Sequence, residues 1–144
     1  MLKKMILAAS LAMSLGQAFA MELYFTVSYQ SYPLDTPNNA GRDIVFEKKP
    51  IHLSVSENNE ALVTEAKNLK KAYIDYVKAT YPAYIERVLK SKYHDNLESH
   101  LDANVNVAYF GTAAKAQADI ADNIEHAKKL GFSIVESRGF SYKK

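Results

Sequence analysis

The stretch ELYFTVSYQSY, residues 22–32, decides the fold of this chain, because its apolar and polar residues alternate. A period of two places one set of side chains on each face of a β-strand, and it is typical of a strand that buries one face. We therefore predict a strand over residues 22–32. The side chains predicted to face the core are Leu23, Phe25, Val27 and Tyr29.

A turn-rich segment and a second strand follow. Residues 32–43, YPLDTPNNAGRD, are crowded with Pro, Asn, Asp and Gly, which favour turns. Residues 44–55 carry spaced apolar side chains but are interrupted at Pro50, which cannot donate a ladder hydrogen bond. The pattern predicts an antiparallel hairpin with a long loop and a second strand that is interrupted or bulged at Pro50.

Two helical segments are indicated by apolar residues spaced three and four apart. The first begins after Asn58 and Asn59, either of which can cap it. Pro82 should break this helix, because proline lacks the amide donor and its ring clashes with the preceding turn. The second helix begins with Thr112 as its cap and ends at Gly131.

A third strand, residues 105–109, separates the helices, and a final strand begins near Phe132 and extends toward Tyr142. A strand, helix, strand unit predicts a right-handed crossover and a parallel pair. The order is strand, strand, kinked helix, strand, helix, strand. It predicts an α+β domain with a mixed four-stranded sheet and helices packed on one face.

The first twenty residues predict a cleavable signal peptide. Lys3 and Lys4 precede an apolar run, and Ala18 and Ala20 supply the small residues that a signal peptidase reads. The run of about eleven apolar residues is shorter than the roughly 20 needed to span a bilayer. We expect cleavage after Ala20 and an exported domain of residues 21–144, periplasmic or secreted from a bacterial cell. The chain has no cysteine, so we do not expect a lipoprotein.

Composition limits the classes of partner. The chain has 18 Lys and Arg against 16 Asp and Glu, and removal of Lys3 and Lys4 makes the two numbers equal. Nucleic-acid binding rests on an excess of basic residues, so we predict no nucleic-acid partner. Because the chain has no cysteine, no disulfide stabilises the fold, and its stability must come from packing. We expect no cofactor and no transmembrane segment after cleavage.

The segment YHDNLESHLD, residues 93–102, is the richest in titratable groups. Drawn as one helix, it places His94, Glu98 and Asp102 on one side, where a metal could be held, whereas His100 points elsewhere. One alternative is a solvated helix face. Another is a helix start at which Asp95 is the cap and Glu98 completes a capping box. We favour these alternatives and predict no metal.

Two further groups of residues are considered as sites, one for an anion and one for an enzyme. Gly111, Thr112 and Lys115 join a strand to a helix start, where backbone donors can receive an anion, but a Thr cap alone explains them. An enzyme, either a small hydrolase or a metal-dependent one, is the alternative to a binding protein. It would have to gather residues from distant segments: Asp43, His52, His94 and Glu98.

The long loop of residues 33–42 is predicted as a binding surface. Loops of this length in a small domain are functional or disordered, and this one combines polar groups with aromatic neighbours. The alternative is a solvated turn without a partner. The candidate residues are Tyr29, Tyr32, Asp35, Thr36, Asn38, Asn39 and Arg42. Since no catalytic constellation can be assembled, we predict a small non-catalytic exported protein that binds another protein or peptide.

Overall fold

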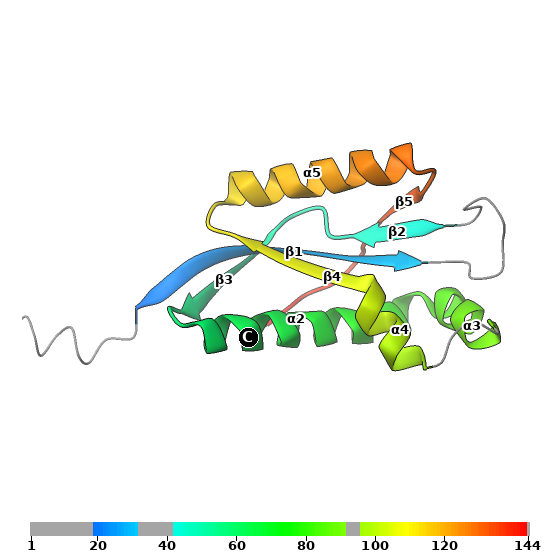
Figure 1. The fold of residues 1–144 in the computed structure, drawn as a ribbon, viewed down its shortest axis with the longest axis horizontal. Helices are drawn as coiled ribbons and strands as arrows, with labels where there is room; N and C mark the ends of the chain where they lie inside the picture. Colours follow the sequence, from blue (N-terminus) through cyan, green and yellow to red (C-terminus); the bar gives the residue numbers. More distant parts are fainter. Residues whose placement is uncertain (1–18, 32–41, 92–95, 144) are drawn as a thin grey trace, which may run out of the picture.

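The computed structural model describes residues 19–31, 42–91 and 96–143. Figure 1 shows a sheet with α5 on one side and α2, α3 and α4 on the other. The chain is α+β with a mixed sheet, as the sequence predicts. Its elements are β1 (Ala20–Ser31), β2 (Asp43–Phe46), β3 (Ile51–Ser56), α2 (Asn59–Thr80), α3 (Pro82–Lys90), α4 (Leu97–Asn104), β4 (Val105–Phe110), α5 (Ala113–Lys129) and β5 (Ser133–Glu136).

The sheet is built around β1. Along one edge, β1 pairs antiparallel with β3 through residues 20–25 and with β2 through residues 28–31. Along its other edge it pairs antiparallel with β4. β5 pairs parallel with β2. The strand predicted from the alternation in residues 22–32 is therefore confirmed, and it is the centre of the sheet.

The predicted second strand exists as two, because β2 and β3 follow each other along the same edge of β1 with Pro50 between them. The sheet consequently has five strands rather than four. The expected parallel pair also differs. β4 and β5 are not neighbours, since β1 and β2 lie between them, and β5 instead pairs with β2.

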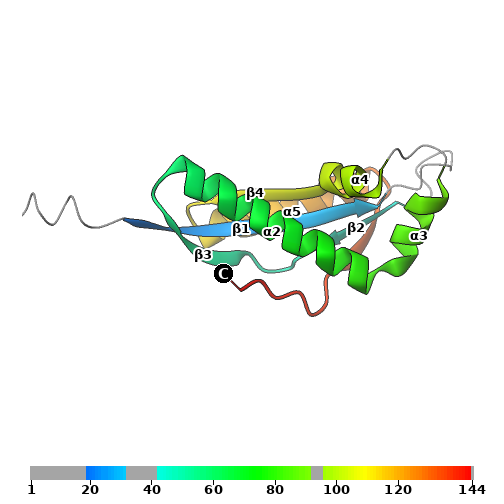
Figure 2. The ribbon, with the colours of Figure 1, turned by 90° about the horizontal axis from the view of Figure 1, so that it is seen from below.

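The helices cover both faces of the sheet, whereas we predicted that they would share one. In Figures 1 and 2, α2 and α5 lie on opposite sides of β1. The reason is that β2 and β5 present apolar residues on the face away from α2. Ala127 of α5 packs there against Ile44 and Phe132. The crossover from β4 to β5 therefore buries an apolar stripe on a face that the sequence analysis left to solvent.

The main core lies between β1 and α2 and is rich in tyrosine. Tyr29 and Tyr73 are fully buried. The Tyr73 hydroxyl lies 2.5 Å from the Ser137 hydroxyl at the margin of this core. Burial raises the pKa of Tyr29 to about 12 and raises that of Tyr73 further. Tyrosine supplies ring area to the core, and a hydroxyl that can reach polar groups at its margin.

Residues 137–143, which we call the C-terminal segment, run along α2 without forming a strand (Figure 2). The Tyr76 hydroxyl donates to the Arg138 carbonyl and accepts from the Arg138 amide, each at 2.8 Å. The Tyr142 hydroxyl donates to the buried Glu65 carboxylate at 2.6 Å. We predicted that the last strand extends toward Tyr142, but it ends at Glu136. The residues that follow are held by side-chain contacts with α2.

The helix boundaries agree with the sequence signals at three points. Asn58 caps α2 by accepting from the Ala61 amide at 2.6 Å, and Thr112 caps α5. The break at Pro82 is confirmed, since α2 ends at Thr80 and α3 begins at Pro82. At α4 the cap is Asn96 rather than Asp95, which lies outside the described residues. No helix within the described ranges has the length and apolar character needed to cross a membrane.

Candidate functional site

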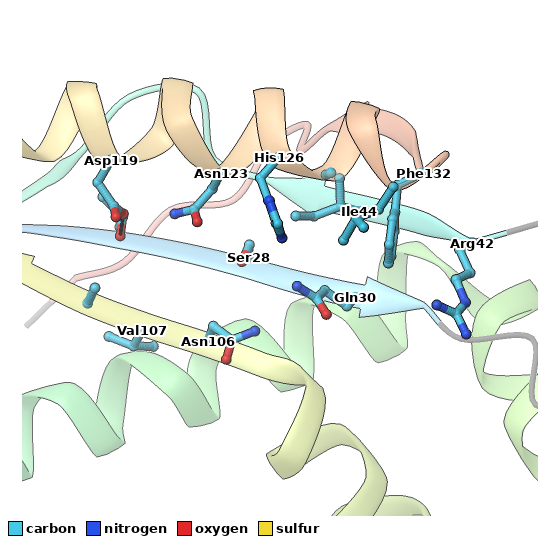
Figure 3. A pocket seen from close by; sticks show the side chains of 14 residues that line it. Ser28, Gln30, Arg42, Ile44, Asn106, Val107, Asp119, Asn123, His126 and Phe132 are labelled. Carbon is cyan, nitrogen blue, oxygen red and sulfur yellow. Dashed lines mark hydrogen bonds between the residues drawn. The ribbon is translucent and has the colours of Figure 1, made fainter. Parts of the chain in front are cut away.

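A cleft of 590 Å³ separates α5 from the part of the sheet formed by β1 and β4 (Figure 3). Its α5 wall carries Asp119, Asn123 and His126, which lie on one side of the helix because they are four and three residues apart. We call this space the polar cleft. Its floor consists of Thr26, Ser28 and Gln30 from β1 with Asn106, Val107 and Ala108 from β4.

The polar lining is unusual for a helix packed on a sheet, since that contact is normally apolar. In α5 the apolar stripe packs over β2 and β5, and the adjacent polar stripe lies over β1 and β4. The Thr26 hydroxyl donates to the Asp119 carboxylate at 3.0 Å and so ties the two walls together. Polar side chains placed where packing favours apolar ones indicate a functional surface.

One end of the polar cleft is formed by Arg42 and Phe132. The Arg42 guanidinium lies 5.8 Å from the centre of the Phe132 ring, within the range of a cation–π contact. The Arg42 carbonyl also accepts from the Ser133 amide at 2.9 Å, which fixes this position next to β5. The cleft therefore offers amide, hydroxyl, carboxylate and cationic groups, which can both donate and accept hydrogen bonds.

The second part of the site is the outer edge of β4, which among the described residues pairs only with β1. The Val27 carbonyl accepts from the Glu47 amide on the β2 side. Because alternate residues of a strand direct their backbone groups to opposite edges, Thr26 and Ser28 turn theirs toward β4.

The residues of β4 opposite Thr26 and Ser28 are Ala108 and Asn106. Their backbone groups therefore face β1. By the same alternation, the N–H and C=O groups of Val107 and Tyr109 point outward from the sheet.

Within the described part of the chain, this edge lacks the usual protection against pairing. Native proteins cover edge strands or interrupt them with charges, proline or bulges. The sequence of β4, VNVAYF, contains no charged residue, proline or glycine. Among the described residues, β4 has a strand partner on its β1 side alone. The edge is therefore a template for an additional strand.

Below the same edge, an apolar groove of 240 Å³ lies between α2 and β4. Two of its side chains are large, apolar and half exposed: Val63 at 51% and Tyr109 at 50%. We call this space the apolar groove. Its lining is Leu62, Val63, Ala66, Lys67, Lys70, Val107 and Tyr109.

The predicted binding loop is described only at its margins. Tyr29 is fully buried in the core, so its ring is not part of a surface. Arg42 lies at the end of the polar cleft. The loop stays a predicted binding surface, and its other candidate residues lie outside the described ranges: Tyr32, Asp35, Thr36, Asn38 and Asn39.

The acidic residues of the metal candidate are paired with lysines of α2. Glu98 accepts from Lys78, and Asp102 lies 3.2 Å from the Lys70 ammonium. His94 lies outside the described residues, and within them no three His, Asp or Glu side chains gather to hold a metal.

At the candidate anion site, the Thr112 hydroxyl already accepts from the Lys115 amide at 3.2 Å. The cap therefore uses one of the amides that an anion would need. Gly111, which precedes the cap, lies beside the exposed start of α5.

The described residues of the enzyme alternative lie apart. Asp43 accepts a hydrogen bond from the Tyr84 hydroxyl at 2.8 Å, and His52 contacts the Glu22 carboxylate at 2.5 Å. On β1, the partners of these two residues are seven positions apart, at Ser31 and Tyr24. Asp43 and His52 are therefore about 23 Å from each other along the sheet.

Sequence reasoning missed the polar cleft. The sequence predicted helices on one face of the sheet only, so it gave no reason to place the polar side of α5 over the other face. Figure 3 shows His126 directed toward the sheet. The sequence feature that could have indicated the cleft is the row of polar residues in β1, at Thr26, Ser28 and Gln30. These residues become one wall of a site only when a helix covers the second face.

No protein-family model, curated protein or solved structure matches this chain.

Proposed function

We propose that this protein binds an extended segment of another polypeptide, which adds as a strand to the outer edge of β4. One observation carries the proposal: an uncharged edge strand lies between two depressions of opposite polarity. Strand addition gives affinity through main-chain hydrogen bonds and specificity through pockets for alternate side chains.

The two depressions suit the geometry of an extended chain. Successive side chains of a strand point to opposite faces of the sheet. In a segment paired with β4, one set would enter the apolar groove against Val107 and Tyr109. The other set would face the polar cleft, where Asn106 and Asn123 can donate and accept hydrogen bonds.

We also propose that the protein is exported to the bacterial envelope or the medium. The support is the order of charge, apolar run and small residues in positions 1–20. Cleavage after Ala20 would leave Met21, the second residue of β1, as the new N-terminus. The intact mass of the purified extracellular or periplasmic form decides this. A mass that retains residues 1–20 would contradict it.

The test of strand addition is substitution of Val107, whose N–H points outward. Val107→Pro removes this donor but leaves the hydrogen bonds between β4 and β1, since proline is tolerated on the solvent side of an edge strand. Val107→Ala is the matched control, because it shortens the side chain and keeps the N–H. Both variants and the unchanged protein are used to capture partners from the envelope fraction, with identification by mass spectrometry.

We expect a partner that Val107→Ala retains and Val107→Pro loses, although circular dichroism shows both variants folded. A partner bound equally by all three proteins would overturn the proposal, because its binding would not use the backbone of β4. Loss from both variants would assign recognition to the Val107 side chain instead.

A further inference from the structure

We infer that the segment bound at β4 is acidic, with an aliphatic side chain in the apolar groove and a carboxylate two residues away on the same face. This inference rests on the proposed strand addition and names the chemistry of its partner. It follows from the charges that line the groove.

The charged residues lining the apolar groove are both lysines, Lys67 and Lys70. Lys70 is 3.2 Å from Asp102, whereas Lys67 forms no salt bridge with any described residue and is exposed. No carboxylate lines this groove. A bound lysine or arginine would therefore meet like charge, and a bound aspartate or glutamate would meet an ammonium group.

The order of residues along the groove fixes the spacing. α2 runs antiparallel to β4, with its first residues near the end of β4 (Figure 1). Leu62 and Val63 therefore lie toward Tyr109, and Lys67 and Lys70 lie further toward the start of β4. Side chains two residues apart on a strand share a face and are about 7 Å apart. In the bound segment, an aliphatic side chain that contacts Val63 and a carboxylate that lies near Lys67 are therefore two residues apart.

The experiment selects peptides from a phage-displayed library of random ten-residue sequences on the immobilised protein. Three variants are selected in parallel. Lys67→Glu reverses the charge beside the apolar groove. Lys71→Glu is the matched control, because Lys71 is also exposed on α2 but does not line this groove. Val107→Pro tests the strand addition itself.

We expect the unchanged protein and Lys71→Glu to enrich Val, Ile or Leu two positions from Asp or Glu. Lys67→Glu should lose this acidic preference. A synthetic copy of a selected peptide should bind Lys67→Glu about three- to tenfold more weakly by fluorescence anisotropy, as expected for one exposed ion pair replaced by repulsion. Val107→Pro should enrich none of these peptides.

The outcomes separate the two proposals. Peptides that require the Val107 N–H but carry no acidic residue, or that bind Lys67→Glu unchanged, would overturn the acidic partner and leave strand addition standing. Peptides that bind Val107→Pro unchanged, or no enrichment at all, would overturn strand addition. A concentration-dependent dimer of the unchanged protein that is absent in Val107→Pro would make a second copy the occupant, and would overturn the acidic partner.

Discussion

The Thr26 hydroxyl donates a 3.0 Å hydrogen bond to the Asp119 carboxylate and so joins the central strand to α5 across the polar cleft. Thr26 is 7% exposed, so this bond is largely shielded from solvent. It holds one wall of the cleft at a fixed position relative to its floor. Its removal should affect both stability and the geometry of the site.

We predict that Thr26→Val lowers the free energy of unfolding by about 1.5 to 3 kcal/mol, the range for hydrogen bonds to charged groups. Valine keeps the shape of threonine but cannot donate to Asp119. Urea denaturation followed by circular dichroism measures the change. The control is Thr64→Val on the exposed surface of α2, which should alter stability by less than about 0.5 kcal/mol. Equal effects at the two positions would contradict a specific role for this bond.

A second prediction tests the direction of the backbone groups in β4. Ala108→Pro should cost at least about 2 kcal/mol, because it removes an N–H that bonds to β1 and leaves the partner carbonyl unsatisfied. Val107→Pro should cost less, since its N–H points outward. Thermal unfolding of the two variants gives the comparison. A larger loss of stability for Val107→Pro would show that the Val107 N–H points toward β1. It would then remove the basis for strand addition.

The strength of a local pattern determined how well the sequence predicted the fold. The alternation of Leu23, Phe25, Val27 and Tyr29 predicted the central strand, and the missing donor of Pro82 predicted the helix break. Both features depend only on neighbouring residues. Pro50 likewise marked the interruption that separates β2 from β3.

Features that depend on the whole sheet were not predictable in this way. The stripe with Ala127 showed that α5 buries one side, but not which sheet face it covers. The strand of residues 133–136 is too short to identify its partner, so pairing with β2 rather than β4 was not evident. The polar cleft arises from these two placements, and for this reason the sequence alone does not bring His126 and Ser28 into one site.

The hydroxyls of Tyr142 and Tyr29 should differ in how much they contribute to stability. The Tyr142 hydroxyl donates to the buried Glu65 carboxylate, whereas the buried Tyr29 hydroxyl has no hydrogen-bond partner among the described residues. Tyr142→Phe should therefore destabilise the protein by about 1 to 3 kcal/mol, and Tyr29→Phe should be neutral or stabilising by up to about 1 kcal/mol. Urea denaturation of both variants measures this. Destabilisation by Tyr29→Phe would show that its hydroxyl has a partner.

The last prediction concerns unfolding by alkali. Burial is the largest cause that raises the pKa of Tyr29, Tyr81 and Tyr142 to about 12, from an ordinary value of 10.0. For Tyr81 the neighbouring Tyr76 hydroxyl adds to the shift, and for Tyr142 the Glu65 carboxylate does so. A raised pKa means that the fold favours the neutral phenol. The resulting stability is fully present below pH 10 and is lost as the pH rises through 12.

We therefore expect that part of the tyrosinate absorbance appears only together with unfolding. The measurement follows near-ultraviolet absorbance and far-ultraviolet circular dichroism on the same samples as the pH is raised. The two signals should change in a shared cooperative step above pH 10. In Tyr142→Phe the folded state lacks the phenol next to Glu65, so its stability should fall less steeply with pH. Complete ionisation of all ten tyrosines while the circular dichroism stays native would contradict the burial of Tyr29 and Tyr73 in the core.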